Sequence, residues 1–391
     1  MRGKIFIAII GLSIGLCSGY FGMKYIIPFY RNQLGNISSL FIPQAHQVIG
    51  FLPYWLTSKS DKNYNKYITT LTYFGLNVGV DGKIVKFNAP GEEEPGWHTL
   101  RLGKVDAFLK NAKRDHVNLS LLIFSGDEAT ISALLSRPAS HAQNLVEEVK
   151  PIMQQYGFTD LNLDIESVSV ASKEARIKFT AFVKEVKKNM DKHRLGTLTI
   201  DVSPTALIKP YLINVTEVSK LADYIVFMMY DFHYTGSLVT GAVSPMGGAG
   251  INAEFDTETG IKEALRIMPS QKILLGTPLY GYGWETLGNT PRSAVMPASG
   301  LTVSNKRAEE FIASCASCSA QIDKEAKESY VIYKDQQTGT YHQMFYPDEQ
   351  ASLEKIRLTN TYKLGGVAVW ALGYDGNSIL NPLEKYKNSF E

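Results

Sequence analysis

The chain has 391 residues, of which 45% are hydrophobic and 20% are charged, a composition typical of a globular protein with a large core. Its 40 basic and 38 acidic side chains give a formal net charge of only +2. Because there is neither a basic excess nor a basic run with interleaved aromatic residues, the sequence gives no reason to expect a nucleic-acid partner.

The N-terminal segment is apolar. Two basic residues lie within Met1–Lys4, and the run from Ile5 to Met23 that follows has no charged residue. Such a run is long enough to span a bilayer as a helix, and the basic residues before it favour export of the rest of the chain. We expect residues 1–23 to be a membrane anchor or, alternatively, a cleaved signal segment, with a linker over 24–46. In both cases the folded part lies outside the cytoplasm, at the cell membrane or secreted.

From residue 47 onward, short β-branched runs alternate with longer stretches of helical period. The expected strands are Val48–Pro53, Tyr67–Leu76, Asn118–Phe124, Asp160–Glu166, Thr197–Ser203, Tyr224–Asp231, Lys272–Thr277 and Gly366–Ala371. The expected helices between them are Leu102–Lys113, His141–Tyr156, Ser172–Met190, Thr216–Leu221, Glu258–Met268 and Gln350–Thr361. Eight strands separated mostly by helices predict an α/β fold, the (β/α)8 TIM barrel, because parallel strands need crossover connections. A doubly wound sheet is the alternative, but no glycine-rich phosphate loop follows the first strand.

A long segment separates the seventh and eighth expected strands. Within it, a helix over Asn305–Ala313 precedes two alternating aromatic runs, Tyr330–Asp335 and Thr340–Tyr346, which flank a polar turn and predict a hairpin. We therefore expect a small α+β insertion over 286–361. The barrel strands one to seven then occupy 47–285, and strand eight with a C-terminal helix occupies 362–391.

Cys315 and Cys318 form the only C-x-x-C pair of the chain. There is no second pair to complete a zinc site and no strand-to-helix context for a redox motif, so a small local disulfide is the favoured interpretation.

The most informative stretch places four polar residues at alternate positions of one strand: Asp160, Asn162, Asp164 and Glu166. Alternate side chains share one face of a strand, so in a barrel these four point inward and rise toward its C-terminal end. Carboxyl groups packed this closely raise one another's pKa, as a general acid near neutral pH requires. The alternative, a solvated edge strand, is disfavoured by the apolar runs on either side.

An Asp-x-Glu sequence that closes a strand after Gly-Phe resembles the signature of family 18 glycoside hydrolases, which include chitinases and peptidoglycan-active enzymes. The last Asp of the family motif corresponds to Asp164, and its Glu corresponds to Glu166. Two positions differ. Thr159 stands where the first Asp of the motif would be, and Asn162 replaces the middle Asp, which in the family normally shares a proton with its neighbour. Asn at this position is similar to the bacterial spore-cortex and germination branch of the family.

Three further segments resemble the family in the expected order. Met228–Asp231 is similar to the Met-x-Tyr-Asp of strand six, Leu275–Gly281 to strand seven, and Gly365–Trp370 to strand eight, whose Trp lies beneath the bound sugar. With the strand-four motif, these matches extend the resemblance over roughly residues 46–385.

The resemblance implies retaining, substrate-assisted hydrolysis of glycans that contain β-linked N-acetylglucosamine, either peptidoglycan or chitin-like chains. Glu166 would be the general acid and base, Asp164 would stabilise the intermediate, and Tyr230 would hold the acetamido carbonyl of the substrate. The other expected substrate-binding residues are Asn162, Asp231, Trp370, Tyr54, Tyr280 and Trp284. For each aromatic residue, packing in the core is the alternative to stacking on a sugar. No metal or cofactor is implied, and the membrane is a partner only through the N-terminal segment.

Two other functions remain as alternatives. The first is a non-catalytic, chitinase-like glycan-binding protein (a lectin); such proteins usually lack the catalytic acid, so Glu166 disfavours this function while Asn162 mildly favours it. The second is a barrel enzyme for phosphate-bearing substrates, which is disfavoured because no glycine cluster follows strands seven and eight.

Overall fold

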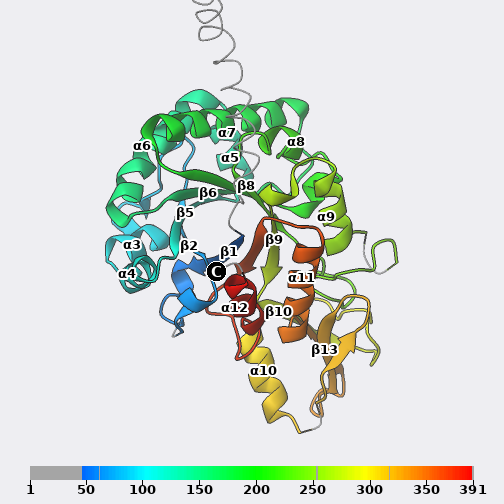
Figure 1. Cartoon of the computed structure of the whole chain (residues 1–391). Helices are drawn as coiled ribbons and strands as arrows, with labels where there is room; N and C mark the ends of the chain where they lie inside the picture. The colour runs from blue at the N-terminus through cyan, green and yellow to red at the C-terminus, as the bar shows by residue number, and fades with distance from the viewer. Residues whose placement is uncertain (1–45, 61, 252–253, 317, 390–391) are drawn as a thin grey trace, which may run out of the picture. The chain divides into compact units, whose positions relative to one another are not determined.

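The computed structural model describes residues 46–60, 62–251, 254–316 and 318–389 (Figure 1). His46–Glu391 forms one compact unit. The predicted anchor over 1–23, and the predicted linker up to residue 45, lie outside the described residues. Within the described ranges, no helix is both long enough and apolar enough to cross a membrane.

Eight parallel strands close into a barrel in the order β1-β2-β5-β6-β7-β8-β9-β15, which confirms the predicted TIM barrel. These strands are β1 (Gln47–Pro53), β2 (Thr70–Asn77), β5 (Asn118–Ser125), β6 (Asp160–Ile165), β7 (Thr197–Val202), β8 (Tyr224–Met228), β9 (Ile273–Pro278) and β15 (Gly366–Trp370). The barrel closes where β1 pairs with β15, with Val48 beside Val367. Each strand lies within a few residues of its predicted position, because short β-branched runs are a local signal.

Helices flank the barrel strands on the outside (Figure 1). They are α3 (Pro95–Arg101), α4 (Asp106–Arg114), α5 (Glu128–Leu134), α6 (Pro138–Tyr156), α7 (Lys173–His193), α8 (Val215–Val218), α9 (Thr257–Leu265), α11 (Glu349–Thr361) and α12 (Asn381–Asn388). Short 3-10 turns occur at η2 (Tyr54–Leu56), η3 (Tyr64–Lys66), η4 (Pro204–Leu207) and η5 (Ser270–Lys272), and β3 (Phe87–Ala89) pairs with β4 (Glu92–Glu93). The outward residues of β6, among them Leu161 and Leu163, are fully buried in one cluster with Phe179 of α7.

The helix predicted over Leu102–Lys113 begins later than expected. A separate helix, α3, ends at Arg101 and α4 begins at Asp106, and Gly103 between them has a left-handed φ of +69°. A glycine in this conformation commonly ends a helix, because it has no Cβ that would be strained.

A second, five-stranded antiparallel sheet is built from the segment between β9 and β15, in the order β11-β10-β14-β13-β12. Its strands are β10 (Tyr280–Thr286), β11 (Leu301–Ser304), β12 (Gln321–Asp323), β13 (Glu328–Lys334) and β14 (Tyr341–Tyr346), and α10 (Asn305–Ser314) follows β11. The strands β13 and β14 form the expected hairpin, with Lys334 opposite Tyr341. A disulfide joins Cys315 and Cys318, as predicted.

The predicted domain boundary after Glu285 falls inside β10. This strand pairs with β14 from Tyr282 to Thr286 and with β11 from Tyr280 to Gly283, so it belongs to the second sheet and not to the barrel. The predicted insertion also contained α11, but this helix contacts β9 and β15 of the barrel. Both ends of the insertion are determined by contacts between segments far apart in the sequence. Local sequence patterns do not show such contacts, so the predicted boundaries differ from the observed ones.

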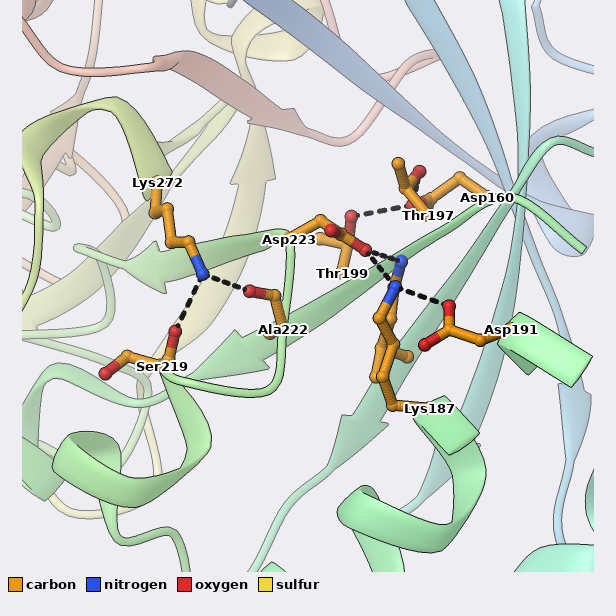
Figure 2. A network of polar contacts seen from close by, with 10 residues as sticks. Asp160, Lys187, Asp191, Thr197, Thr199, Ser219, Ala222, Asp223 and Lys272 are labelled. Atoms are coloured by element: carbon orange, nitrogen blue, oxygen red, sulfur yellow. Dashed lines mark hydrogen bonds and ion pairs between the residues drawn. The ribbon is translucent and has the colours of Figure 1, made fainter. Parts of the chain in front are cut away.

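The first acidic residue of the β6 series belongs to a polar network at the N-terminal ends of the strands (Figure 2). The buried carboxylate of Asp160 accepts hydrogen bonds from the hydroxyls of Thr197 and Thr199 at 2.6 and 2.9 Å, and from that of Ser120 at 2.6 Å. Burial raises the pKa of Asp160, and these three hydrogen bonds oppose the rise. Asp160 therefore has a structural role: its hydrogen bonds connect β5, β6 and β7.

The network continues between the strands and the helices (Figure 2). Asp223 accepts the backbone N–H of Leu198 at 2.8 Å and pairs with Lys187 of α7 at 3.0 Å. Lys272 donates to the carbonyls of Ser219 and Ala222 at 3.0 and 2.8 Å. These contacts lie at the end of the barrel opposite Glu166, where polar residues usually serve stability and not catalysis.

Candidate active site

The β6 strand delivers its polar side chains to the barrel interior as its alternation predicts. Asn162 is 0% exposed and Asp164 is 4% exposed, whereas Glu166 directly follows the strand and is half-buried. The backbone N–H of Glu166 donates to the carbonyl of Ser125 on β5 at 2.8 Å, which fixes the point where its side chain leaves the barrel wall.

Glu166 lines a cleft of about 340 Å³ at the C-terminal ends of the barrel strands. Tyr230 and Asp231, from the segment directly after β8, line the same cleft. The structure thus brings together Glu166, predicted from the strand-four motif, with Tyr230 and Asp231, predicted from the strand-six motif. In barrel enzymes this end carries the active site, because the loops after the strands converge there.

The two acidic residues at the end of β6 have raised pKa values. Burial, and then the negative charge of Asp231, raises the pKa of Glu166. The pKa of Asp164 is raised well above its usual range by burial first, and then by the charges of Glu166 and Asp201. A carboxyl group in such surroundings retains its proton to higher pH, as a general acid requires.

Tyr230 is held neutral beside these acids. Burial is the main cause that raises the pKa of its phenol, followed by the negative charges of Asp201 and Asp164. The hydroxyl therefore remains a hydrogen-bond donor across the range in which the carboxyl groups titrate.

Asp231 is fixed by two tyrosines from β10. The backbone of Asp231 has a left-handed φ of +61°, and its Oδ1 accepts the hydroxyls of Tyr280 at 2.5 Å and Tyr282 at 2.8 Å. Burial raises the pKa of Asp231, and these two hydrogen bonds oppose the rise. Tyr280, predicted to bind substrate, is only 5% exposed and positions Asp231 instead; Tyr282 was not predicted.

The Tyr282→Phe variant should be less stable than the wild type by about 1–2 kcal/mol at pH 7, because it removes a hydrogen bond to an ionised carboxylate. The loss should shrink as the pH falls through the pKa of Asp231, since the protonated form needs that donor less. Urea unfolding at pH 7 and at about pH 4 measures both effects. An equal loss at both pH values would contradict the assignment of the hydrogen bond to the charged form.

Aromatic residues surround Trp370 at the end of β15. The ring of Trp370, which is half-buried, lies 4.9 Å from that of Phe74 and 6.2 Å from that of Trp55, measured between centroids. Tyr54, in the turn after β1, packs edge-on against Trp55 at 4.9 Å. Trp370 and Tyr54 therefore stay candidates for sugar contact, and Trp55, which is 38% exposed, joins them.

Trp284 does not face the cleft, contrary to the prediction that it binds substrate. It is 1% exposed, its ring lies 6.3 Å from that of Phe345, and its Nε1–H donates to the carbonyl of Tyr234 at 3.1 Å. The cause is the pairing of β10 with the second sheet, which directs this side chain into the cluster beneath that sheet. Trp284 is a core residue.

Asp201 is a buried acid of the site that sequence reasoning missed. It lies on the inward face of β7, is 4% exposed, and its Oδ1 accepts the amide of Asn162 at 3.1 Å. The signal was present, because Thr197, Thr199 and Asp201 alternate as the β6 series does. Within the described ranges, His, Cys, Asp and Glu side chains form no group of three or more that is arranged to hold a metal ion.

The family model of the glycosyl hydrolases family 18 matches residues 47–375. Among curated proteins, the cortical fragment-lytic enzyme of Bacillus cereus is 23% identical over 79% of this chain, and the match spans 66% of that protein, just under two thirds of its length. The putative sporulation-specific glycosylase YdhD of Bacillus subtilis is 26% identical over 90% of this chain and 75% of its own length. These matches confirm the predicted resemblance to the spore-cortex branch.

Solved structures have the same fold. The spore cortex-lytic enzyme SleL of Bacillus megaterium superimposes with a TM-score of 0.69 at 21% identity, over 87% of this chain and 74% of that one. A Group IV chitinase of Ostrinia furnacalis, in complex with allosamidin, superimposes with a TM-score of 0.73 at 18% identity, over 88% of this chain and 98% of the other.

Proposed function

Because the chain belongs to the glycosyl hydrolases family 18, we propose that it cleaves glycans at β-linked N-acetylglucosamine, with retention of configuration and with the acetamido group of the substrate as the nucleophile. One observation supports this most strongly. Glu166, whose pKa burial raises, lines the cleft beside Tyr230, while Asp164 lies buried two residues before it on the same strand.

In the first step, Glu166 donates its proton to the glycosidic oxygen, and the bond to the anomeric carbon breaks. The acetamido oxygen of the same sugar attacks the anomeric carbon and forms a cyclic oxazolinium ion, so the positive charge is transferred to the acetamido group. Glu166 is left as a carboxylate, ready to act as a base.

Asp164 and Tyr230 bind the acetamido group during this step. The Oδ1 of Asp164 is buried and has no hydrogen-bond partner among the described residues, so it is available to accept the acetamido N–H. Its negative charge then stabilises the oxazolinium ion. The neutral hydroxyl of Tyr230 donates to the acetamido oxygen and orients it toward the anomeric carbon.

In the second step, Glu166 removes a proton from water, which attacks the anomeric carbon from the side that the leaving group occupied. The oxazolinium ring opens, and the product has the configuration of the substrate. Burial, and then the negative charge of Asp231, raises the pKa of Glu166, so the acid stays protonated to higher pH.

The proposed substrate is a cell-envelope glycan. The relatives named cortical fragment-lytic enzymes favour peptidoglycan over chitin-like chains. The uncharged run from Ile5 to Met23 favours a chain that is anchored in the cell membrane, or secreted, with its active site outside the cytoplasm.

The test is to incubate the full-length chain with N-acetylglucosamine oligomers, with the same oligomers after N-deacetylation, and with purified peptidoglycan, and to identify products by mass spectrometry. We expect cleavage of acetylated glycans only, because a free amine cannot form the oxazolinium ion. Equal cleavage of the deacetylated oligomers would contradict the substrate-assisted mechanism. Binding of the oligomers without any cleavage would contradict the proposed enzyme activity and support the alternative function, a non-catalytic glycan-binding protein.

A further inference from the structure

The inward positions of β6 and β7 place two acids side by side. The two strands are parallel, with Asn162 beside Thr199 and Leu163 beside Ile200. Asp164 and Asp201 are the next residues along the two strands, and the charge of Asp201 raises the pKa of Asp164. Since alternate side chains of a strand share a face, both belong to the inward series of their strands. Neighbouring strands lie about 4.8 Å apart, so the two carboxyl groups are within reach of each other.

Asn162 connects to the same acid. Its amide donates to Oδ1 of Asp201 at 3.1 Å, and both residues are buried. Asp201 also lines a small cavity, of about 70 Å³, together with Glu166. The barrel interior below Glu166 therefore contains a second carboxyl group even though position 162 of β6 has an amide.

We propose that Asp201 is a positioning residue that pairs with Asp164 across β6 and β7 and supplies the carboxyl group that Asn162 lacks. The inference rests on the proposed function, since it assigns to Asp201 a part in preparing Asp164 for the substrate. In this arrangement the acid next to Asp164 stands on β7, as Asp201, and not on β6 at position 162.

Electrostatics favour one shared proton in this pair. Two carboxylates this close and this buried repel each other strongly, so the pair holds one proton and one negative charge. Burial is the first cause that raises the pKa of both acids. The other titratable groups whose charges act on the pair are Glu166 and Asp160, and the pair in turn raises the pKa of the neighbouring Tyr230.

The experiment compares four full-length chains: wild type, Asp201→Asn, Asn162→Asp, and the exchange variant Asn162→Asp/Asp201→Asn. Asp201→Asn is nearly isosteric and should lower kcat at least about tenfold, because Asp164 loses its partner. It should also move the acidic limb of the kcat profile, since one titrating group is gone. The exchange variant should recover kcat to within about threefold of wild type, because it restores two adjacent acids. Asn162→Asp alone, which crowds three acids, should be slower than the exchange variant.

Unchanged kcat and pH profile in Asp201→Asn would overturn the proposal, as would an exchange variant that folds yet is no faster than Asp201→Asn. A second measurement does not need activity. Raised carboxyl pKa values weaken the folded state as the pH rises from about 4, the ordinary carboxyl pKa, through the raised values. The wild type should therefore lose more Tm than Asp201→Asn between about pH 4 and pH 7.

The Tm measurement tests the pairing of Asp164 with Asp201 separately from the proposed hydrolase function. If the wild type cleaves no glycan, the proposed function fails, and the pairing is then judged on the Tm values alone. A Tm difference between wild type and Asp201→Asn that does not change with pH would overturn the pairing whether or not the chain is an active hydrolase.

Discussion

The Glu166→Gln variant is expected to lose about 1,000-fold in kcat on N-acetylglucosamine oligomers while it still binds them. Glutamine keeps the size and hydrogen-bonding capacity of the side chain but has no proton to give to the glycosidic oxygen. Because the side chain lines the cleft without being needed for the barrel core, the fold should not change. Product formation by mass spectrometry and oligomer binding by calorimetry measure the two quantities separately.

Glu217→Gln is the matched control for this prediction. Glu217 is exposed on α8 and pairs with Lys220 on the surface, so the same chemical change there should leave kcat as in the wild type. A Glu166→Gln variant that retains more than about one tenth of wild-type kcat would show that another group supplies the proton.

The second large effect is expected at Glu328 and Lys355, two buried residues of opposite charge that bind the segment between β8 and α9. Glu328 of β13 is 1% exposed and accepts the backbone N–H groups of Val243 and Ser244 at 2.9 and 2.7 Å. Lys355 of α11 is 2% exposed and donates to the carbonyl of Ser244 and to the hydroxyl of Thr257. The two side chains therefore hold Ser244 from its N–H and from its carbonyl, and they connect the second sheet, the barrel helix and the segment that also forms part of the cleft.

Glu328→Gln or Lys355→Met should each lower the free energy of unfolding by about 3 kcal/mol at pH 7, because each leaves buried polar groups without a charged partner. The double variant should lose less than the sum of the two, since neither charge then remains alone. Burial is the main cause that raises the pKa of Glu328 to about 7 and lowers that of Lys355 to about 7, and the charge of each residue opposes the shift of the other. Each charged form is therefore favoured by the charge of its partner. Guanidinium unfolding of the four chains provides the comparison, and strictly additive losses would contradict the coupling.

The features that the sequence predicted correctly depend on local periodicity. The alternation of Asp160, Asn162, Asp164 and Glu166 has the period of a strand, so their common inward direction followed without knowledge of the neighbours. The eight barrel strands and the β13–β14 hairpin were predictable for the same reason.

The features that were missed depend on contacts between distant segments. Trp284 and Asp201 each lie in a strand that the local pattern indicates, but their surroundings depend on which strands pair with each other. Trp284 is buried because β10 pairs with β14, and Asp201 matters because β7 lies beside β6 in a particular register. The pattern of one strand indicates which residues share a face, but it does not indicate which other element packs against that face.

The configuration of the first product tests the central proposal most directly. The full-length chain is mixed with a β-linked N-acetylglucosamine oligomer, and the anomeric protons of the new reducing end are followed by NMR before they equilibrate. Substrate-assisted cleavage by Glu166 and Asp164 predicts that the β anomer appears first. Initial formation of the α anomer would mean that water attacks directly with inversion, and it would contradict the assignment of the acetamido group as the nucleophile.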